Sequence, residues 1–233
     1  MNLFYQPLIP QGALHLDPDE SRHAIKVLRK RNGDLIRVTD GKGVFYEGII
    51  TDADAHQCTF DIHTTVPDRE KNFRIHICIS PTKNADRIEW FVEKAVEFGV
   101  DEITLLQCDH TERQHLKVER LNKTAVSAMK QSLKAKLPII HPITDFRNVL
   151  ISTNDEQKYI AHVDERNQQH LQQLVERGHS YLVLIGPEGD FSADELTLAD
   201  AHGFKKVSLG PSRLRTETAG IAACHILNLA NTP

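Results

Sequence analysis

Two segments near the C-terminus combine glycines with charged side chains in a way that suits ligand binding and catalysis. Residues 186–191 read GPEGDF, and residues 209–218 read LGPSRLRTET. Two glycines within four residues permit tight turns and the close approach of a ligand to the backbone. The second segment adds Arg213, Arg215 and Glu217, two cations and a carboxylate that can stabilise developing charge or accept a proton.

Both segments follow apolar runs that are typical of buried strands. Residues 181–185 (YLVLI) precede the first segment, and a short run at 207–209 leads into the second. In an open parallel sheet, ligands bind in the crevice beyond the carboxyl ends of the strands. The sequence therefore predicts that the two segments meet in space as one ligand pocket. A surface turn is the alternative for the GPEG stretch taken alone.

Several common kinds of site are disfavoured by the sequence. No GxGxxG follows an early strand and no GxxxxGK[ST] occurs, which disfavours nicotinamide and ATP enzymes. The histidines show no HExxH or zinc-finger spacing, so we predict no metal. The cysteines form no CxxC pair and lie in apolar stretches, which is typical of buried, reduced thiols.

Two clusters of basic residues favour a nucleic-acid partner, although the net charge is −4. Residues 22–31 include Arg22, Lys26 and Arg29 and contain no acid. Residues 113–136 begin at Arg113 and contain a single glutamate among many cations. Clustered cations can hold phosphates even when the rest of the surface is acidic. A solvated helix face is the alternative explanation of each cluster.

The composition predicts a globular chain with no membrane partner. Hydrophobic residues make up 40% of the chain and charged residues 26%, which is outside the range of disordered proteins. No apolar run approaches the roughly 18–20 residues that a membrane span needs. The N-terminus lacks the basic start and apolar core of a signal peptide, so we expect a cytoplasmic protein.

The first part of the chain reads as mostly β-structure. Strand-like stretches are predicted at residues 2–5, 34–39, 44–51 and 57–66. The sequence at 40–43 (DGKG) suits the turn of a hairpin. One helix is expected after Asp17, a good N-cap that is followed by Pro18 and, three residues on, by Glu20. A compact β-barrel with one helix fits this length.

After the polar stretch at 67–72, strands and helices alternate. Strands are predicted at residues 74–80, 102–106, 158–163, 181–185 and 207–209. Helices are predicted around residues 88–96 and 117–136, after Ser192, and at 217–229. Such alternation implies an α/β domain with a mainly parallel sheet. We therefore expect one domain at 1–70 and a second at 71–233.

At these segments the chain resembles the RsmE family, SPOUT-class methyltransferases that modify N3 of a uridine in small-subunit ribosomal RNA. The resemblance spans essentially the whole chain. It rests on HAIKVLR at 23–29, KAVEFGV at 94–100, QSLKAKLP at 131–138, IGPEGDF at 185–191 and LGPSRLRTETA at 209–219. The last two motifs together are the most specific, because GPEG alone occurs in several SPOUT branches.

The resemblance implies a fold and a cofactor. Residues 1–70 would form a PUA-like RNA-binding barrel, and residues 71–233 a SPOUT α/β domain with a trefoil knot. S-adenosylmethionine would bind to the loops after Val163, Ile185 and Leu209, and the working form would be a homodimer. The expected cofactor-binding residues are Ile185, Gly186, Glu188, Gly189, Leu209, Gly210, Leu214 and Ala219.

Roles for charged residues follow from the implied reaction. Methylation at N3 of uridine requires loss of the imide proton, which spreads negative charge over O2 and O4. Arg215 is the candidate for stabilising that charge. Glu217 is a candidate to accept the proton, and Glu188 is an alternative. Arg22, Lys26, Arg29 and Arg113 are expected to bind phosphates of 16S ribosomal RNA in the small ribosomal subunit.

Two other functions remain open from the sequence. The first alternative is a non-catalytic RNA-binding factor for ribosome assembly that retains the same fold. The intact glycine turn and the LRTETA stretch favour an enzyme instead. A SPOUT enzyme that methylates a ribose 2′-hydroxyl is the second alternative, because the residues themselves do not show the target atom.

Overall fold

The computed structural model describes residues 2–162 and 169–232. The chain divides into two compact units, residues 1–70 with 126–137, and residues 71–125 with 138–233. The stretch 126–137, which the sequence placed in the second domain, thus groups with the first unit. Within the part of the chain that the structure describes, no helix has the length and apolar character needed to cross a membrane.

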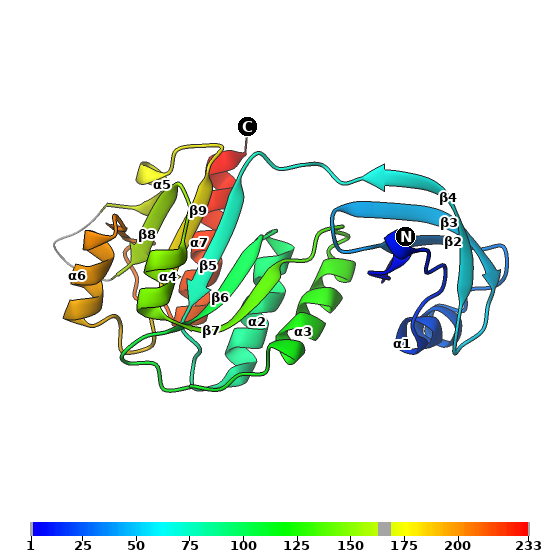
Figure 1. Cartoon of the computed structure of the whole chain (residues 1–233), viewed down its shortest axis with the longest axis horizontal. Helices are drawn as coiled ribbons and strands as arrows, with labels where there is room; N and C mark the ends of the chain where they lie inside the picture. Colours follow the sequence, from blue (N-terminus) through cyan, green and yellow to red (C-terminus); the bar gives the residue numbers. More distant parts are fainter. Residues whose placement is uncertain (1, 163–168, 233) are drawn as a thin grey trace. The chain divides into compact units, whose positions relative to one another are not determined.

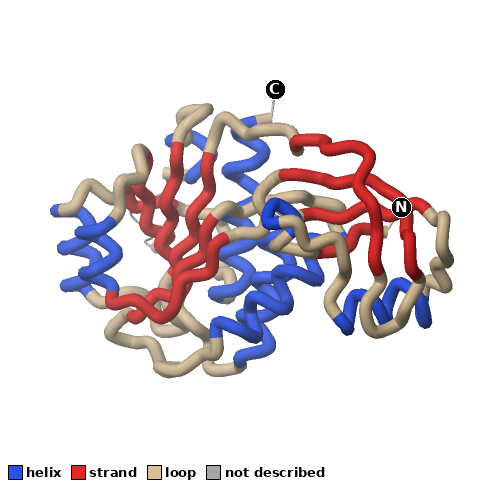
Figure 2. The backbone as a smooth tube through the Cα atoms, turned by 45° about the vertical axis from the view of Figure 1, so that its right-hand side comes forward, coloured by secondary structure: helices blue, strands red, loops and turns tan. Residues whose placement is uncertain are grey.

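The first unit contains a four-stranded sheet in the order β1-β2-β3-β4. The strands of both units are drawn in red in Figure 2. The strands of the first unit are β1 (Leu3–Tyr5), β2 (Leu35–Thr39), β3 (Val44–Asp52) and β4 (Thr59–Pro67). β1 runs parallel to β2, and the other neighbours are antiparallel. The DGKG turn joins β2 to β3 as predicted, with Gly41 and Gly43 at φ values of 76° and 101°, which favour glycine.

A short helical segment follows η1 (Ile9–Gln11) and packs with this sheet. α1 (Pro18–Arg22) continues into η2 (His23–Val27), a turn of π-helix. The Asp17 carboxylate accepts hydrogen bonds from the N–H groups of Asp19 and Glu20, which confirms the predicted N-cap. Glu20 does not close a capping box, because one of its oxygens instead accepts the N–H of Tyr5 at 3.3 Å.

The second unit is built on a six-stranded sheet, parallel throughout, as the sequence predicts. The strands are β5 (Arg74–Ile79), β6 (Glu102–Gln107), β7 (Ile139–Asp145), β8 (Gln157–Ala161), β9 (Ser180–Ile185) and β10 (Lys205–Val207), in the order β10-β8-β9-β5-β6-β7 (Figure 1). The end of the strand predicted at 158–163 is different, because β8 ends at Ala161 and Val163 lies outside the described residues. The trefoil knot stays a prediction.

β7 was not predicted from the sequence, and its Pro142 explains why. Proline cannot donate a hydrogen bond to a neighbouring strand, so it argues against a strand in the interior of a sheet. β7 is the edge strand, where one side needs no partner, and its register with β6 shifts between Thr104 and Leu105. An edge position and a local irregularity thus accommodate the proline.

Helices cover both faces of this sheet. They are α2 (Ala85–Glu97), α3 (Val118–Gln131), α4 (Phe146–Ser152), α5 (Leu171–Leu174), α6 (Ala193–Ala201) and α7 (Thr216–Asn231). α2 buries the predicted apolar positions and stops at Gly99, which has a φ of 75°. α3 ends at Gln131 rather than at the predicted residue 136, because the chain turns at Leu133 with a φ of 54°.

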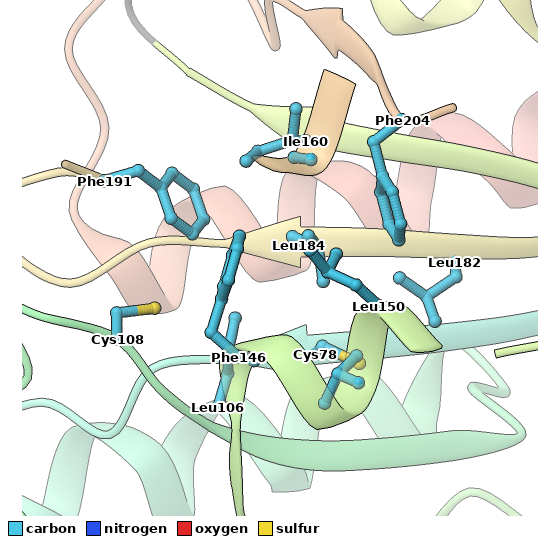
Figure 3. Close-up of a cluster of buried hydrophobic side chains, with 12 residues drawn as sticks. Cys78, Leu106, Cys108, Phe146, Leu150, Ile160, Leu182, Leu184, Phe191 and Phe204 are labelled. Carbon is cyan, nitrogen blue, oxygen red and sulfur yellow. The ribbon is translucent and has the colours of Figure 1, made fainter. Parts of the chain in front are cut away.

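Alternation along the strands separates two apolar layers. Leu182 and Leu184 of β9 pack with Phe146 and Leu150 of α4 on one face (Figure 3). On the other face, Ile79 of β5 lies beside α2 and α7. Here Gly220 of α7 faces Phe91 of α2 so closely that an added Cβ would lie 2.5 Å from the Phe91 ring. The missing side chain at Gly220 therefore lets α7 pack tightly on α2 and β5.

Replacing Gly220 with alanine tests this close packing. The new Cβ would meet Phe91 and also lie 3.0 Å from Ile79 Cδ1, so the helices must shift. Overpacking of this kind lowers the free energy of unfolding by about 1–3 kcal/mol, which urea denaturation measures. The matched control is Thr218→Ala, at an exposed position of the same helix, which should change it by less than about 0.5 kcal/mol. Equal stability of the two variants would contradict the packing.

Candidate active site

A cavity of about 790 Å³ opens at the carboxyl ends of three adjacent strands. The last residues of β8, β9 and β10 line it, namely Ala161, Ile185 and Val207. This is where a parallel α/β sheet binds ligands, and the volume lies within the usual range of about 300–1,000 Å³ for small-molecule pockets. The strand order thus places a ligand site at the predicted edge of the sheet.

The two segments singled out in the sequence meet in this cavity, as predicted. The Thr216 hydroxyl donates a hydrogen bond of 3.1 Å to the carbonyl oxygen of Gly186, which ties the second segment to the first. Seven of the eight expected cofactor-binding residues line the cavity: Ile185, Gly186, Glu188, Leu209, Gly210, Leu214 and Ala219. Gly189 lies instead beside the His110 side chain.

The local structure of these segments explains their glycines. A Cβ at Gly186 would lie 2.9 Å from the ring of Phe191, which is buried in the apolar layer below. Gly210 adopts a φ of 134°, which side chains rarely tolerate. Next to it, the Ser208 hydroxyl accepts a hydrogen bond from the N–H of Gly210. Gly186 is therefore required because the Phe191 ring lies close to it, and Gly210 because of its backbone conformation.

The cavity offers both apolar walls and unused backbone donors. Ala161, Val207 and Leu209 contribute apolar surface. Among the described residues, the backbone N–H groups of Leu209 and Leu214 donate no hydrogen bond. Buried or half-buried backbone donors are normally satisfied, so these groups are available to a ligand. An apolar slot with a few convergent polar groups suits a nucleoside.

The sequence did not single out His162 and Asp190, two polar residues that line the cavity. His162 follows β8 directly, and its Nδ1 lies 2.9 Å from Oδ2 of Asp190, which belongs to the GPEGDF segment. Asp190 adopts a left-handed φ of 63°, which aspartate tolerates because its carboxylate can bond locally, here to the N–H of Phe191. The rule that ligands bind beyond strand ends singles out His162, once β8 is known to end at Ala161.

The two candidate catalytic residues lie at the start of α7, outside the cavity lining but beside it. Arg215 is the N-cap residue, and its exposed side chain contacts no described residue through a hydrogen bond or ion pair. Glu217 is 7% exposed, and its Oε2 is buried without a hydrogen-bond partner among the described residues. Their neighbours Leu214 and Thr216 line the cavity. One cation and one carboxylate oxygen are therefore uncommitted at its edge.

Arg87 of α2 connects the two candidate proton acceptors, and the sequence did not single it out. Its Nη1 lies 3.1 Å from Oε1 of Glu188, and its Nε lies 3.8 Å from Oε1 of Glu217. The arginine is a surface position of an amphipathic helix, so no local pattern marks it. Only the packing of α2 against α7 brings it to the site.

The predicted RNA-binding residues have different surroundings. Arg22, Lys26 and Arg29 are exposed on α1, η2 and the residues that follow. Arg29 adopts a φ of 56°, and the π-helical turn before it is a feature often found at functional sites. Arg113 is half-buried, and its guanidinium donates to the carbonyl oxygens of Thr82 and Lys83. Arg113 therefore holds the loop after β5 in place.

The four cysteines are free and buried, as predicted. Burial raises the pKa of Cys58 to about 11 and that of Cys224 to about 12, so both remain protonated, unreactive thiols near neutral pH. Within residues 2–162 and 169–232, no group of histidine, cysteine, aspartate and glutamate is arranged to hold a metal ion.

Comparison with known proteins identifies the family of both units. An RNA methyltransferase domain family matches residues 69–228, and an RNA methyltransferase PUA domain family matches residues 16–62. The ribosomal RNA small subunit methyltransferase E of Buchnera aphidicola is 30% identical over 88% of this chain and 83% of its own length.

Solved structures agree over almost the whole chain. A probable rRNA-methyltransferase from Porphyromonas gingivalis is 42% identical, with a TM-score of 0.93 over 98% of this chain and 99% of that one. The ribosomal RNA small subunit methyltransferase E of Neisseria gonorrhoeae, solved bound to S-adenosyl methionine, is 27% identical, with a TM-score of 0.87 over 99% and 98%. The chain thus belongs to the ribosomal RNA small subunit methyltransferase E family, with a PUA domain followed by a SPOUT-type methyltransferase domain.

Proposed function

We propose that this protein transfers the methyl group of S-adenosylmethionine to N3 of a uridine in 16S ribosomal RNA. The observation that carries the proposal is the single cavity formed by the GPEGDF and LGPSRLRTET segments at the carboxyl ends of β8, β9 and β10. Relatives of the same family are named ribosomal RNA small subunit methyltransferase E, a name that fits this activity. Because its substrate is ribosomal RNA, the protein acts in the cytoplasm.

The residues of the cavity fit S-adenosylmethionine. The apolar walls suit an adenine ring, and the unused N–H groups of Leu209 and Leu214 suit its nitrogen atoms. Glu188 and Asp190 also line the cavity, and carboxylates suit the positively charged amino and sulfonium groups of this cofactor. The eight expected cofactor-binding residues are proposed to serve this role, seven from the lining and Gly189 from the turn between them.

The reaction replaces the proton on N3 with a methyl group. S-adenosylmethionine would supply the electrophilic methyl group from its sulfonium, and S-adenosylhomocysteine would be the leaving product. Arg215 has a guanidinium free of described partners, and it stabilises the negative charge that develops on O2 and O4 as the proton leaves N3. Glu217, with one buried and unpartnered oxygen, accepts the proton. Much of the rate comes from holding N3 in line with the methyl group, so the uridine must be splayed out of any helix.

Mass spectrometry of nucleosides tests the proposed function. Small ribosomal subunits from cells that lack the enzyme are incubated with the protein and S-adenosylmethionine, and their RNA is digested. We expect N3-methyluridine to appear only when both are present. A ribose-methylated nucleoside would show the alternative enzyme class. If a calorimetric titration detects no binding of S-adenosylmethionine to the protein, a non-catalytic assembly factor is indicated instead.

Arg215→Ala tests the proposed electrostatic role. Removing one preorganised donor lowers turnover by about 10²–10³-fold, whereas the affinity for S-adenosylmethionine should change little. Single-turnover measurements on small subunits give the rate. Arg177→Ala, which removes an exposed arginine from the same unit, is the control. Turnover of the Arg215 variant within a few-fold of wild type would rule out this role.

RNA binding is proposed to involve Arg22, Lys26 and Arg29 of the first unit, together with Arg113. The first three are exposed and lie in a PUA domain. Arg113 contributes by holding the loop after β5, in addition to any contact of its own. Such residues act mainly through phosphate contacts, which release counterions from the RNA.

Arg29→Ala tests the contribution of the first unit. Loss of one phosphate contact weakens RNA binding and reduces the slope of log K against log salt by about 1. Fluorescence anisotropy with an RNA fragment over a range of salt concentrations measures both. Lys205→Ala, an exposed lysine of β10, controls for the loss of one positive charge. An unchanged slope in the Arg29 variant would place this residue outside the interface.

The working form is proposed to be a homodimer. Ile221, Ala222 and Ile226 of α7 are only half-buried, and Leu229 is 52% exposed at the same helix. Trp90 of α2, a helix that packs on α7, is 44% exposed. Exposed apolar positions on neighbouring helices support an interface between subunits. Sedimentation should give twice the chain mass of 26.4 kDa, and a monomer at micromolar concentration would contradict the proposal.

A further inference from the structure

Arg87 links three segments of the second unit through its guanidinium. It belongs to the first turn of α2, whose start is fixed by Asn84, which accepts the N–H of Asp86. From there it contacts Glu188 in the turn after β9 at 3.1 Å and Glu217 in the first turn of α7 at 3.8 Å. Among these residues, Glu188 alone lines the cavity. Arg87 therefore acts on the cavity from outside it.

The two contacts differ in their surroundings. The side chain of Glu217 is 9% exposed, whereas those of Arg87 and Glu188 are 35% and 42% exposed. A buried carboxylate needs a compensating partner, so Glu217 anchors the arginine to α7. The anchored guanidinium then restrains the more exposed Glu188 and, with it, the turn at 186–189. The planar fork of arginine suits a link between two carboxylates better than an ammonium group does.

We propose that Arg87 is a positioning residue that fixes the 186–189 turn for cofactor binding by linking Glu188 to Glu217. The inference rests on the proposed function, because the ligand of the cavity is taken to be S-adenosylmethionine. Arg87 itself touches neither cofactor nor RNA in this role. Its contribution is the correct placement of Glu188 and of the backbone that follows β9.

Charge alone would have the opposite effect, which makes the role testable. S-adenosylmethionine carries a sulfonium and an ammonium group, so removing a nearby cation and freeing the Glu188 carboxylate would by itself favour binding. Loss of a positioning contact instead leaves the turn less ordered, and ordering it on binding then lowers the affinity. Arg87→Ala therefore separates the two effects. Tighter binding of S-adenosylmethionine would indicate the charge effect, and weaker binding would indicate loss of positioning.

Calorimetric titration of the full-length protein with S-adenosylmethionine measures this sign. We expect Arg87→Ala to weaken binding about tenfold, and Arg87→Lys, which keeps the charge and one donor, to weaken it by less than about threefold. Lys94→Ala is the matched control, because among the described residues this lysine of the same helix forms ion pairs only with its neighbours Glu93 and Glu97. The affinity of Lys94→Ala for S-adenosylmethionine should stay within about twofold of that of the wild type.

A double-mutant cycle with Glu188→Gln identifies the partner. If both substitutions break the same link, their effects should not add. The Kd of Arg87→Ala/Glu188→Gln for S-adenosylmethionine should then be no more than about twofold above the Kd of the single variant that binds less tightly. Additive losses would overturn the proposal, as would unchanged or tighter binding by Arg87→Ala. Should that variant fail to fold, the same cycle is run with Arg87→Gln, which also removes the charge and the guanidinium. If the wild-type protein does not bind S-adenosylmethionine, the proposed function itself is overturned. If wild type and Arg87→Ala bind it equally well, only the role of Arg87 is overturned.

Discussion

The close packing of α7 against β5 and α2 at Gly220 is the constraint on which the site depends. A side chain there would overlap the ring of Phe91, so glycine sets the separation of the two helices. With α7 in this place, its first turn presents Thr216 to the carbonyl oxygen of Gly186 and Glu217 to Arg87. An apolar contact in the core therefore fixes the polar groups at the edge of the sheet.

The parallel sheet supplies the other half of the site. Because β8, β9 and β10 are neighbours that run in the same direction, the segments that follow them must leave the sheet at the same edge. The segments after β9 and β10, GPEGDF and LGPSRLRTET, contain glycines, and both line the cavity.

The two units serve the same activity by different physical means. In the first, Arg22, Lys26 and Arg29 are exposed on and after a short helical segment. In the second, Arg215 and the unpartnered Oε2 of Glu217 lie at the start of α7, a helix held by close packing at Gly220. In the proposed function, exposed cations suit long-range attraction to phosphate, whereas methyl transfer requires groups held in a defined geometry.

The sequence alone determined the class of both domains, the edge of the sheet that holds the site, and the two segments that line it, because strand length, helix caps and glycine turns are local properties. It did not reveal β7, whose Pro142 is acceptable only at an edge, nor the early end of α3 at Gln131. The pairing of His162 with Asp190 and the link from Arg87 to both glutamates were decided by tertiary structure. These contacts join residues up to about 130 positions apart, and no local pattern in a sequence specifies which distant side chains packing will bring together.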